Sequence, residues 1–176
     1  MAVQLAVALG CEIWVTSSSA DKIKRARQLG ALGGALYTQS DWCAQLGDIT
    51  FDAVVDGSGG QALNDYMRLL RRGGSLVTYG ATAGLCVNPP FNVFALFLQN
   101  LSFKGTAMGS DHEFAALLRL VTEQRVVPVV DSVFPLQQAS EAFARMDAGL
   151  QFGKIVLTCG AAEKSAREMN SLTSKL

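Results

Sequence analysis

The sequence lacks an excess of charge of either sign. Its 176 residues carry 15 basic and 15 acidic side chains, so the net charge is zero with histidine neutral. Proteins that bind nucleic acid or anionic membranes through charge present a strongly basic surface. We therefore expect no nucleic-acid partner and no polybasic contact with a membrane.

Long apolar runs are missing as well. The longest apolar patch covers residues 91–98 and is interrupted by Asn92, whereas a membrane-spanning helix needs about 20 apolar residues. The apolar N-terminus has no basic leader, and its helical spacing ends at Gly10, which favours a short helix over a signal peptide. The sequence predicts no membrane segment and a cytoplasmic protein.

Patterns of metal ligands are also absent. The single histidine, His112, has no second histidine four residues away, and the cysteines form no C-x-x-C pair. Structural zinc sites place their ligands in such pairs, so we predict no metal site in this chain. Scattered thiols are typical of small side chains in a reducing cytoplasm. The four cysteines are Cys11, Cys43, Cys86 and Cys159.

What the sequence does contain is a regular alternation of short strands and helices. Strands are expected at 12–16, 35–38, 51–56, 75–79 and 101–106, and helices at 2–9, 20–29, 41–46, 61–70, 93–99 and 111–124. Valine-rich strands such as 51–56 are typical of buried parallel strands. Their alternation with helices predicts an α/β fold with a doubly wound parallel sheet of Rossmann type.

The pattern changes after Gln124. An extended β-branched stretch at 126–134 contains Pro128, and a helix at 137–147 and a last strand at 153–158 are expected to follow. The final residues are polar and predict a frayed helix or a disordered tail. We expect three parts: a nucleotide-binding domain at 1–125, a returning segment at 126–160 and a polar tail at 161–176.

Hydroxyl groups gather at the end of the first expected strand. Ser17, Ser18 and Ser19 follow it, and Lys22 lies in the first turn of the next helix. NAD-binding proteins place an acidic residue here to bind the 2′-hydroxyl of the adenosine ribose. Hydroxyls, helix N-terminal amides and a lysine instead favour a 2′-phosphate. The pattern favours NADP(H), although a serine helix cap before a solvated helix face explains the same residues.

Glycine-rich loops follow two later strands, at 57–60 and 79–84. In an open parallel sheet the carboxyl ends of the strands are where ligands bind, and glycine lets a cofactor approach the backbone closely. Tyr37 ends another short strand and either faces the adenosine part of a cofactor or is an ordinary strand aromatic. Two such loops at successive strand ends indicate a nucleotide site.

Five segments carry a resemblance to a known family. They are FDAVVDGSGG at 51–60, GGSLVTYG at 73–80, FKGTAMGS at 103–110, VPVVDSVFPL at 127–136 and FGKIVL at 152–157. In this order the chain resembles the medium-chain dehydrogenase/reductase superfamily, in its zinc-type alcohol dehydrogenase and quinone oxidoreductase branches. The resemblance covers residues 1–158.

The resemblance implies a role for particular residues in cofactor binding. Ser17, Ser18 and Lys22 match positions that hold the 2′-phosphate, with Tyr37 near the adenosine end. Gly57 and Ser58 match loop positions near the adenine-side ribose, and Gly80, Ala81 and Thr82 match positions beside the nicotinamide. Thr106, Ala107 and Met108 match the segment that binds the nicotinamide carboxamide. Lys154 matches a position near the pyrophosphate.

The sequence also departs from the family. A strand and a G-x-G-x-x-G loop precede the first helix in the family, and so does the catalytic domain that carries the substrate pocket or zinc. Here the chain starts inside that helix, so we expect an N-terminally truncated Rossmann fold with two half-sheets, no catalytic residue, and zinc only in the missing domain. The resemblance further implies a homodimer through the edge strand at 101–106.

Two functions stay open at this point. One is the cofactor-binding part of an NADP(H)-dependent oxidoreductase that transfers hydride to or from a quinone, enone, aldehyde or alcohol, with a small-molecule substrate bound by the full-length form. The other is a non-catalytic, truncated domain that acts as a structural or interaction module. A flavodoxin-like or methyltransferase-like domain fits the alternation but not the segments at 103–110 and 152–157.

Overall fold

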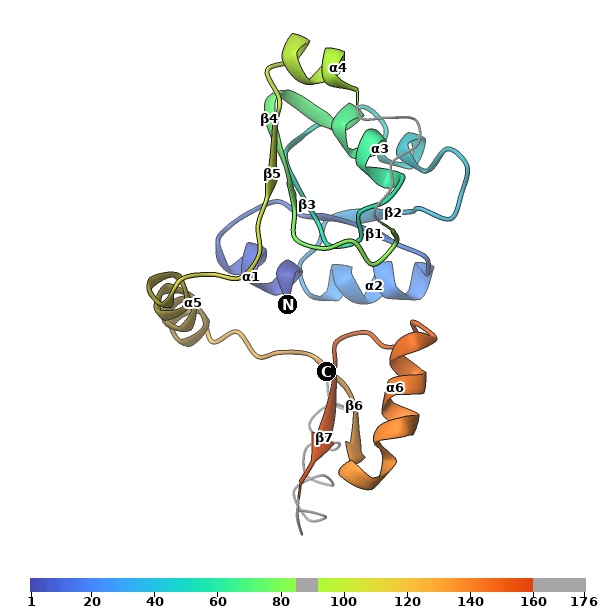
Figure 1. Ribbon diagram of the computed structural model, residues 1–176, viewed down its shortest axis with the longest axis vertical. Coiled ribbons are helices and arrows are strands. Elements are labelled where there is room, and N and C mark those ends of the chain that lie inside the picture. Colours follow the sequence, from blue (N-terminus) through green and yellow to red (C-terminus); the bar gives the residue numbers. More distant parts are fainter. Residues whose placement is uncertain (85–91, 160–176) are drawn as a thin grey trace. The chain divides into compact units, whose positions relative to one another are not determined.

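The computed structural model describes residues 1–84 and 92–159 (Figure 1). Its elements alternate between helix and strand along most of the chain. In order they are α1 (Ala2–Ala8), β1 (Trp14–Ser17), α2 (Ala20–Gln28), β2 (Gly33–Leu36), η1 (Trp42–Leu46), β3 (Phe51–Asp56), α3 (Ala62–Arg68), β4 (Leu70–Thr78), α4 (Val93–Leu98), β5 (Ser102–Gly105), α5 (Asp111–Glu123), β6 (Val130–Pro135), η2 (Leu136–Gln138), α6 (Ala139–Asp147) and β7 (Lys154–Thr158).

The chain divides into two compact units. Unit 1 contains residues 1–15 and 20–33 and the described residues from 117 onward, with α1, α2, β6, α6 and β7. Unit 2 contains residues 16–19 and 34–116, with α3, α4, β3, β4 and β5. The predicted division at residue 125 stays a prediction.

Unit 2 is built on a parallel sheet of order β3–β4–β5 (Figure 1). Val55 of β3 pairs with Val77 of β4, which pairs with Lys104 of β5. Strand β4 begins at Leu70 and not at residue 75 as the sequence predicted, so Gly73 and Gly74 lie inside it, and its register with β3 shifts between Phe51 and Ala53. Parallel strands that alternate with helices confirm the predicted α/β fold of Rossmann type.

The expectation of a buried strand at 51–56 is wrong for half of its residues. Asp52, Ala53 and Val55 of β3 are exposed, and only Asp56 is buried. Within the described residues β3 pairs with β4 alone, because β1 and β2 form a sheet of their own. As predicted, the central sheet is therefore divided into two half-sheets, and β3 has the exposed side chains of an edge strand.

The core of the molecule lies in unit 2. Its buried apolar side chains come from β2, η1, α3 and β4 and from Leu101 just before β5, and Leu76 is only 1% exposed. Burying such a leucine contributes about 2 kcal/mol. The rings of Trp42 and Tyr66 meet edge to face, with centroids 5.7 Å apart. By contrast, among the described residues of unit 1 the buried apolar side chains are those of Ala26, Ala31 and Ala142.

The predicted helix near 41–46 is a short 3₁₀-helix, η1. Gly47 follows it with a positive φ of 60°, which ends the turn before a regular α-helix forms. The side chain of Gln45 bonds both backbone groups of Leu36, accepting from its N–H at 2.9 Å and donating to its carbonyl at 3.3 Å. These two bonds hold the end of β2 against η1.

Unit 1 contains a second parallel pair, β6 and β7, with α6 beside it (Figure 1). The strand starts at Val130, two residues after Pro128, whose missing N–H is unsuited to a strand interior. The carboxylate of Asp131 in β6 accepts a hydrogen bond from Nε of Arg145 at 2.7 Å and from the backbone N–H of Phe152 at 2.9 Å. Arg25 of α2 stacks on the ring of Phe152 at 4.4 Å.

Helix α5 begins with the reciprocal hydrogen bonds of a capping box. The backbone N–H of Ser110 donates to Glu113 at 2.7 Å, and the N–H of Glu113 donates to the Ser110 hydroxyl at 3.3 Å. The two hydrogen bonds from Ser110 lower the pKa of the Glu113 carboxyl. None of the side chains of α5 is buried.

Cys86 and the predicted tail at 161–176 lie outside the described residues. Within the described residues, no helix has the length and apolar character needed to cross a membrane.

Candidate functional site

The two glycine-rich loops after β3 and β4 pack against each other in unit 2. The backbone N–H of Ala83 donates to the Ser58 carbonyl at 2.8 Å, and the N–H of Tyr79 donates to the Asp56 carbonyl at 2.9 Å. A Cβ on Gly80 would lie 2.4 Å from the Gly57 carbonyl oxygen. The glycines therefore allow two backbones to touch at the carboxyl ends of β3 and β4.

The carboxylate of Asp56 holds the first of these loops. One oxygen accepts hydrogen bonds from the Ser58 backbone N–H at 3.0 Å and from its hydroxyl at 2.6 Å. The other accepts from the Gly59 backbone N–H at 2.7 Å. Asp56 is only 4% exposed, so these donors replace water around a buried carboxylate.

Thr78, the last residue of β4, connects the carboxylate to the second loop. Its hydroxyl lies 3.2 Å from the Gly80 carbonyl and 3.4 Å from Asp56. Because a hydroxyl has a single proton, the shorter contact to Gly80 is the better hydrogen bond. The ends of β3 and β4 are thus joined through side chains as well as backbone.

Tyr66 of α3 extends this network to β1. Its side chain is buried at 8% exposure, and its hydroxyl lies beside the hydroxyls of Thr16 and Ser58. Burial raises the pKa of the Tyr66 hydroxyl, and the Asp56 carboxylate adds to the increase. The tyrosine is therefore neutral at physiological pH and able to donate a hydrogen bond.

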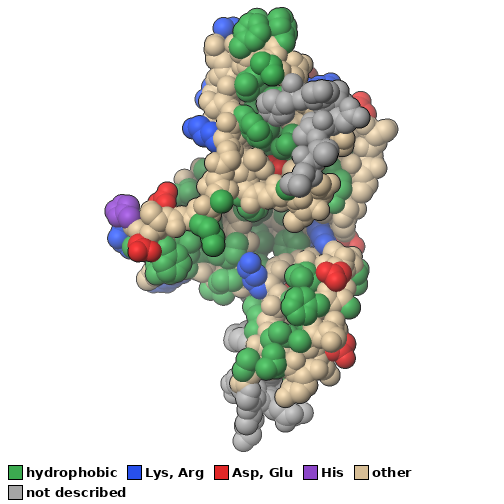
Figure 2. Space-filling view, viewed as in Figure 1, with side chains coloured by type: hydrophobic (Ala, Val, Ile, Leu, Met, Phe, Trp, Pro, Cys, Tyr) green, Lys and Arg blue, Asp and Glu red, His purple; other side chains and the backbone are tan. Residues whose placement is uncertain are grey.

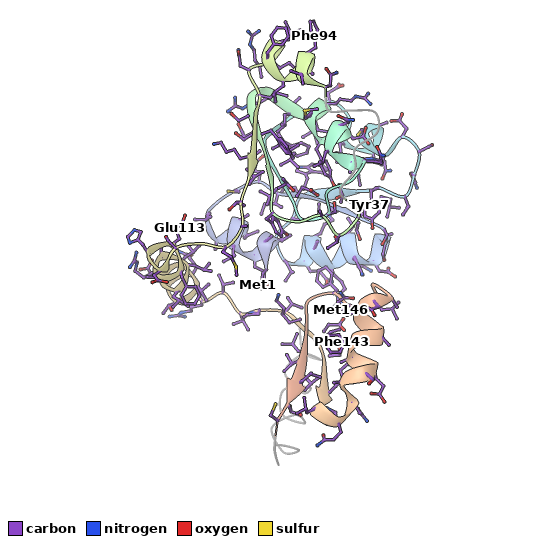
Figure 3. The ribbon with its side chains drawn as sticks, viewed as in Figure 1. Met1, Tyr37, Phe94, Glu113, Phe143 and Met146 are labelled. Atoms are coloured by element: carbon purple, nitrogen blue, oxygen red, sulfur yellow. The ribbon has the colours of Figure 1, made fainter. Side chains whose placement is uncertain are left out.

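Ser17 and Tyr37, two of the predicted site residues, are adjacent in unit 2. The backbone N–H of Tyr37 donates to the Ser17 carbonyl at 3.2 Å, and the Ser17 hydroxyl accepts from the Ser19 N–H at 3.2 Å. The Tyr37 side chain is 51% exposed at the end of β2 (Figure 3), and Ser18 is exposed as well. The structure brings these three residues together at one strand end.

The predicted carboxamide segment continues β5 at the same edge. The backbone N–H of Thr106 donates to the Thr78 carbonyl at 2.9 Å, next to the glycine loops. Thr106, Ala107 and Met108 are exposed, as are Ala81 and Thr82 in the loop after β4. Met108 has a positive φ of 63°, a conformation uncommon for a non-glycine residue and typical of functional loops.

Lys22 and Lys154 belong to unit 1. The ammonium group of Lys22 donates a hydrogen bond to the Gly149 carbonyl. Lys154 starts β7 and is exposed, and its backbone N–H donates to the Val129 carbonyl at 2.8 Å. Their predicted contacts with a cofactor phosphate stay predictions.

Sequence reasoning missed Thr16, Asp56, Tyr66 and Thr78 as site residues. Asp56 could have been found from the sequence, because it is an acidic residue at the end of an otherwise apolar strand. Nothing local marked Tyr66, because its partners lie 50 residues before it, at Thr16, and in the loop after β3. Such a contact exists only once the strand ends are brought together.

Comparison with known proteins places the chain in a family. The family model described as zinc-binding dehydrogenase matches residues 1–123. This chain belongs to the zinc-binding dehydrogenase family. The predicted resemblance to the nucleotide-binding portion of medium-chain dehydrogenases and reductases is thereby confirmed.

Individual relatives support the assignment of this chain to the zinc-binding dehydrogenase family. The zinc-type alcohol dehydrogenase-like protein YogA of Leptosphaeria maculans is 34% identical over 163 residues, which are 86% of this chain and 45% of YogA. A crystal structure of an NAD-dependent alcohol dehydrogenase is 31% identical, with a TM-score of 0.78 over 90% of this chain and 47% of that chain. A mycobacterial protein solved with NADPH shares the fold at 24% identity, with a TM-score of 0.71 over 89% of this chain and 52% of that chain. The chain spans about half the length of the curated relatives it matches.

The zinc in the family's description has no counterpart in the described part of this chain. Among residues 1–84 and 92–159, no three or more histidine, cysteine, aspartate or glutamate side chains are grouped so that they could hold a metal ion. A zinc site needs such a group, so these residues do not fit one.

Proposed function

We propose that this chain is the cofactor-binding part of an NADP(H)-dependent oxidoreductase that transfers hydride to or from a quinone, enone, aldehyde or alcohol. The observation that carries the proposal is the gathering of the β1, β3, β4 and β5 ends in unit 2, with two glycine loops and exposed hydroxyls. Ligands of open parallel sheets bind at this edge. The names of the relatives, alcohol dehydrogenase and quinone oxidoreductase-like protein, support the reaction class.

The bound nicotinamide would supply the hydride, and the residues of this chain would hold and orient the cofactor. Ser17, Ser18 and Tyr37 would line its adenosine end, and Gly57 and Ser58 the adjacent ribose. In the proposed arrangement Ala81, Thr82 and the exposed backbone at 106–108 would lie beside the nicotinamide. The position of Ser17, where NAD-binding proteins carry an acid, favours a 2′-phosphate because no carboxylate repels it.

Lys22 provides the most direct test of the preference for NADP(H). Replacing Lys22 with alanine is expected to weaken NADPH binding about tenfold, since a charge-assisted hydrogen bond to phosphate contributes about 1.5 kcal/mol. NADH affinity should stay unchanged, because NADH has no 2′-phosphate. Isothermal titration calorimetry of both cofactors with the 176-residue chain measures the two affinities.

Lys24→Ala is the matched control for this experiment. Lys24 is an exposed residue on the same helix and is not one of the proposed contacts, so its loss should leave the NADPH to NADH ratio as in the wild type. Equal binding of NADH and NADPH by the wild type would refute the 2′-phosphate contact. Oligomerisation without any nucleotide affinity would instead support a non-catalytic interaction module.

We further propose a homodimer through the edge strand at 101–106. In the described sheet β5 pairs with β4 on one side only, and such an open edge is suited to a second strand. Helix α4, which precedes β5, carries exposed apolar side chains, seen as hydrophobic surface in Figure 2 and with Phe94 labelled in Figure 3. They are Val93, Phe94, Phe97 and Leu98.

A charge on β5 should weaken this dimer. Phe103 is 43% exposed, and Phe103→Asp would place two like charges near each other across a symmetric strand pair, which is destabilising. Sedimentation equilibrium should show at least a tenfold weaker dimer. A wild-type chain that is monomeric at all concentrations, or a variant that dimerises equally well, would refute the proposed interface.

A further inference from the structure

A line of side-chain hydroxyls connects the ends of two strands of unit 2, β1 and β3, through α3 to one buried carboxylate. Thr16 lies in β1, Tyr66 in α3, Ser58 in the loop after β3, and Asp56 at the end of β3. Tyr66 contacts both Thr16 and Ser58, and the Ser58 hydroxyl lies 2.6 Å from Asp56. The Ser58 hydroxyl donates to Asp56, and the hydroxyls of Tyr66 and then Thr16 come next in line, so the four side chains are placed to form a continuous chain.

The direction of this chain follows from counting protons. An ionised carboxylate only accepts, so the Ser58 hydroxyl must donate its single proton to Asp56. Ser58 is then left to accept from Tyr66, whose hydroxyl also has one proton. The Tyr66 oxygen therefore accepts from Thr16. Every hydroxyl points toward the carboxylate, and the arrangement has one consistent direction.

Asp56 cannot be replaced by an amide without losing a bond. Its two oxygens accept from different backbone groups, the N–H of Ser58 and the N–H of Gly59. Asparagine has one acceptor oxygen and an amino group, so one of these two N–H groups would face another donor. Two acceptor oxygens are thus what the loop geometry requires.

We propose that Asp56 is a positioning residue for the cofactor. It anchors the directed chain from Thr16 through Tyr66 and Ser58, and it thereby fixes the glycine loop after β3 relative to the ends of β1 and β4. This inference rests on the proposed function, since those strand ends are where the adenosine part of the cofactor would bind. A loop held in its bound form before binding loses less entropy when the ligand arrives, and affinity rises accordingly.

The first test compares Asp56→Asn with Asp52→Asn in the 176-residue chain. Asp52 lies on the same strand, but its carboxylate is 82% exposed and pairs with Arg71 at the surface. Calorimetry should show NADPH binding at least tenfold weaker for Asp56→Asn and within about twofold of the wild type for Asp52→Asn. Equal affinities for Asp56→Asn and the wild type would overturn the inference while leaving the proposed function intact.

A second measurement needs no cofactor. In Asp56→Asn the amides of Gly59 and Ala83, which bond Asp56 and Ser58 in the wild type, should exchange hydrogen at least tenfold faster. The alkaline titration of Tyr66, followed by tyrosinate absorbance, should shift to lower pH because the nearby negative charge is gone. Unchanged exchange and an unchanged titration would refute the anchoring role whatever the chain binds.

Tyr66→Phe covers the case in which Asp56→Asn does not fold. It removes one hydroxyl and keeps the ring against Trp42, and NADPH binding should weaken at least threefold with the thermal transition still cooperative. Wild-type affinity in this variant would contradict the directed chain. A wild type that binds neither NADPH nor NADH would refute the proposed function and the cofactor role of Asp56. If the amides of Gly59 and Ala83 still exchange hydrogen faster in Asp56→Asn, that result would nevertheless support the anchoring of the loop by Asp56.

Discussion

Replacing Gly80 with alanine is expected to lower the free energy of unfolding by about 3 kcal/mol. The new Cβ would lie 2.4 Å from the Gly57 carbonyl oxygen and 3.2 Å from its carbon. These are backbone atoms, and they cannot rotate away as a flexible side chain does. One of the two glycine loops must therefore move, and the hydrogen bond from Ala83 to the Ser58 carbonyl would be strained or lost.

Gly105→Ala is the matched control for this variant. Gly105 lies in β5 of the same sheet, its φ is not positive, and a Cβ there meets no atom of the described chain within 4 Å. Chemical denaturation followed by circular dichroism should give a wild-type midpoint for Gly105→Ala and a much lower midpoint for Gly80→Ala. If both alanine variants unfold alike, the loops do not pack as closely as described.

Removing the Asp131 carboxylate is expected to destabilise unit 1 by about 2 kcal/mol. The side chain is 3% exposed and accepts from Arg145 and from the Phe152 backbone N–H. In Asp131→Ala both donors lose their partner, and Arg25, whose Nη1 lies 4.0 Å away, loses a nearby charge. Arg145 and Arg25 are 35% and 46% exposed, so water compensates for part of the loss and the value stays moderate.

The contribution of Asp131 should depend on pH in a defined direction. Burial acts to raise the pKa of this carboxyl, but hydrogen bonds from Arg145 and Phe152 outweigh it, and the pKa lies below its ordinary value of 3.8. A group with a depressed pKa in the folded state stabilises above its unfolded pKa and loses that effect as pH falls through the folded value. The stability difference between the wild type and Asp131→Ala should therefore be full at neutral pH and shrink below about pH 4.

Asp147→Ala controls for the simple loss of a negative charge. Asp147 ends α6 and is exposed, so its removal should change the unfolding free energy by no more than about 0.5 kcal/mol. Urea denaturation of the three proteins at neutral and acidic pH provides the comparison. A difference between the wild type and Asp131→Ala that grows on acidification would contradict the assigned direction of the pKa shift.

The alternation of strands and helices was readable from the residues because it depends on local periodicity. The expected strand at 51–56 is β3 to the residue, and the helix expected at 20–29 is α2 (Ala20–Gln28). The family resemblance rested on short segments in a fixed order, and the family model covers most of that range. The exposure of Asp52 and Val55 was not readable, because whether a strand is covered depends on its neighbours in the sheet.

The sequence by itself determined that this chain is an α/β protein with glycine loops after two strands and hydroxyls after a third. Turn-forming residues and apolar periodicity depend on only a few neighbouring residues, so they can be recognised without a structure. Only the tertiary structure decided that Gly80 and Gly57 make room for each other, and that Asp56 collects the donors of Ser58 and Gly59 while Tyr66 connects them to β1. These contacts join segments that are far apart in the sequence, and local sequence patterns do not specify which strand ends pack together.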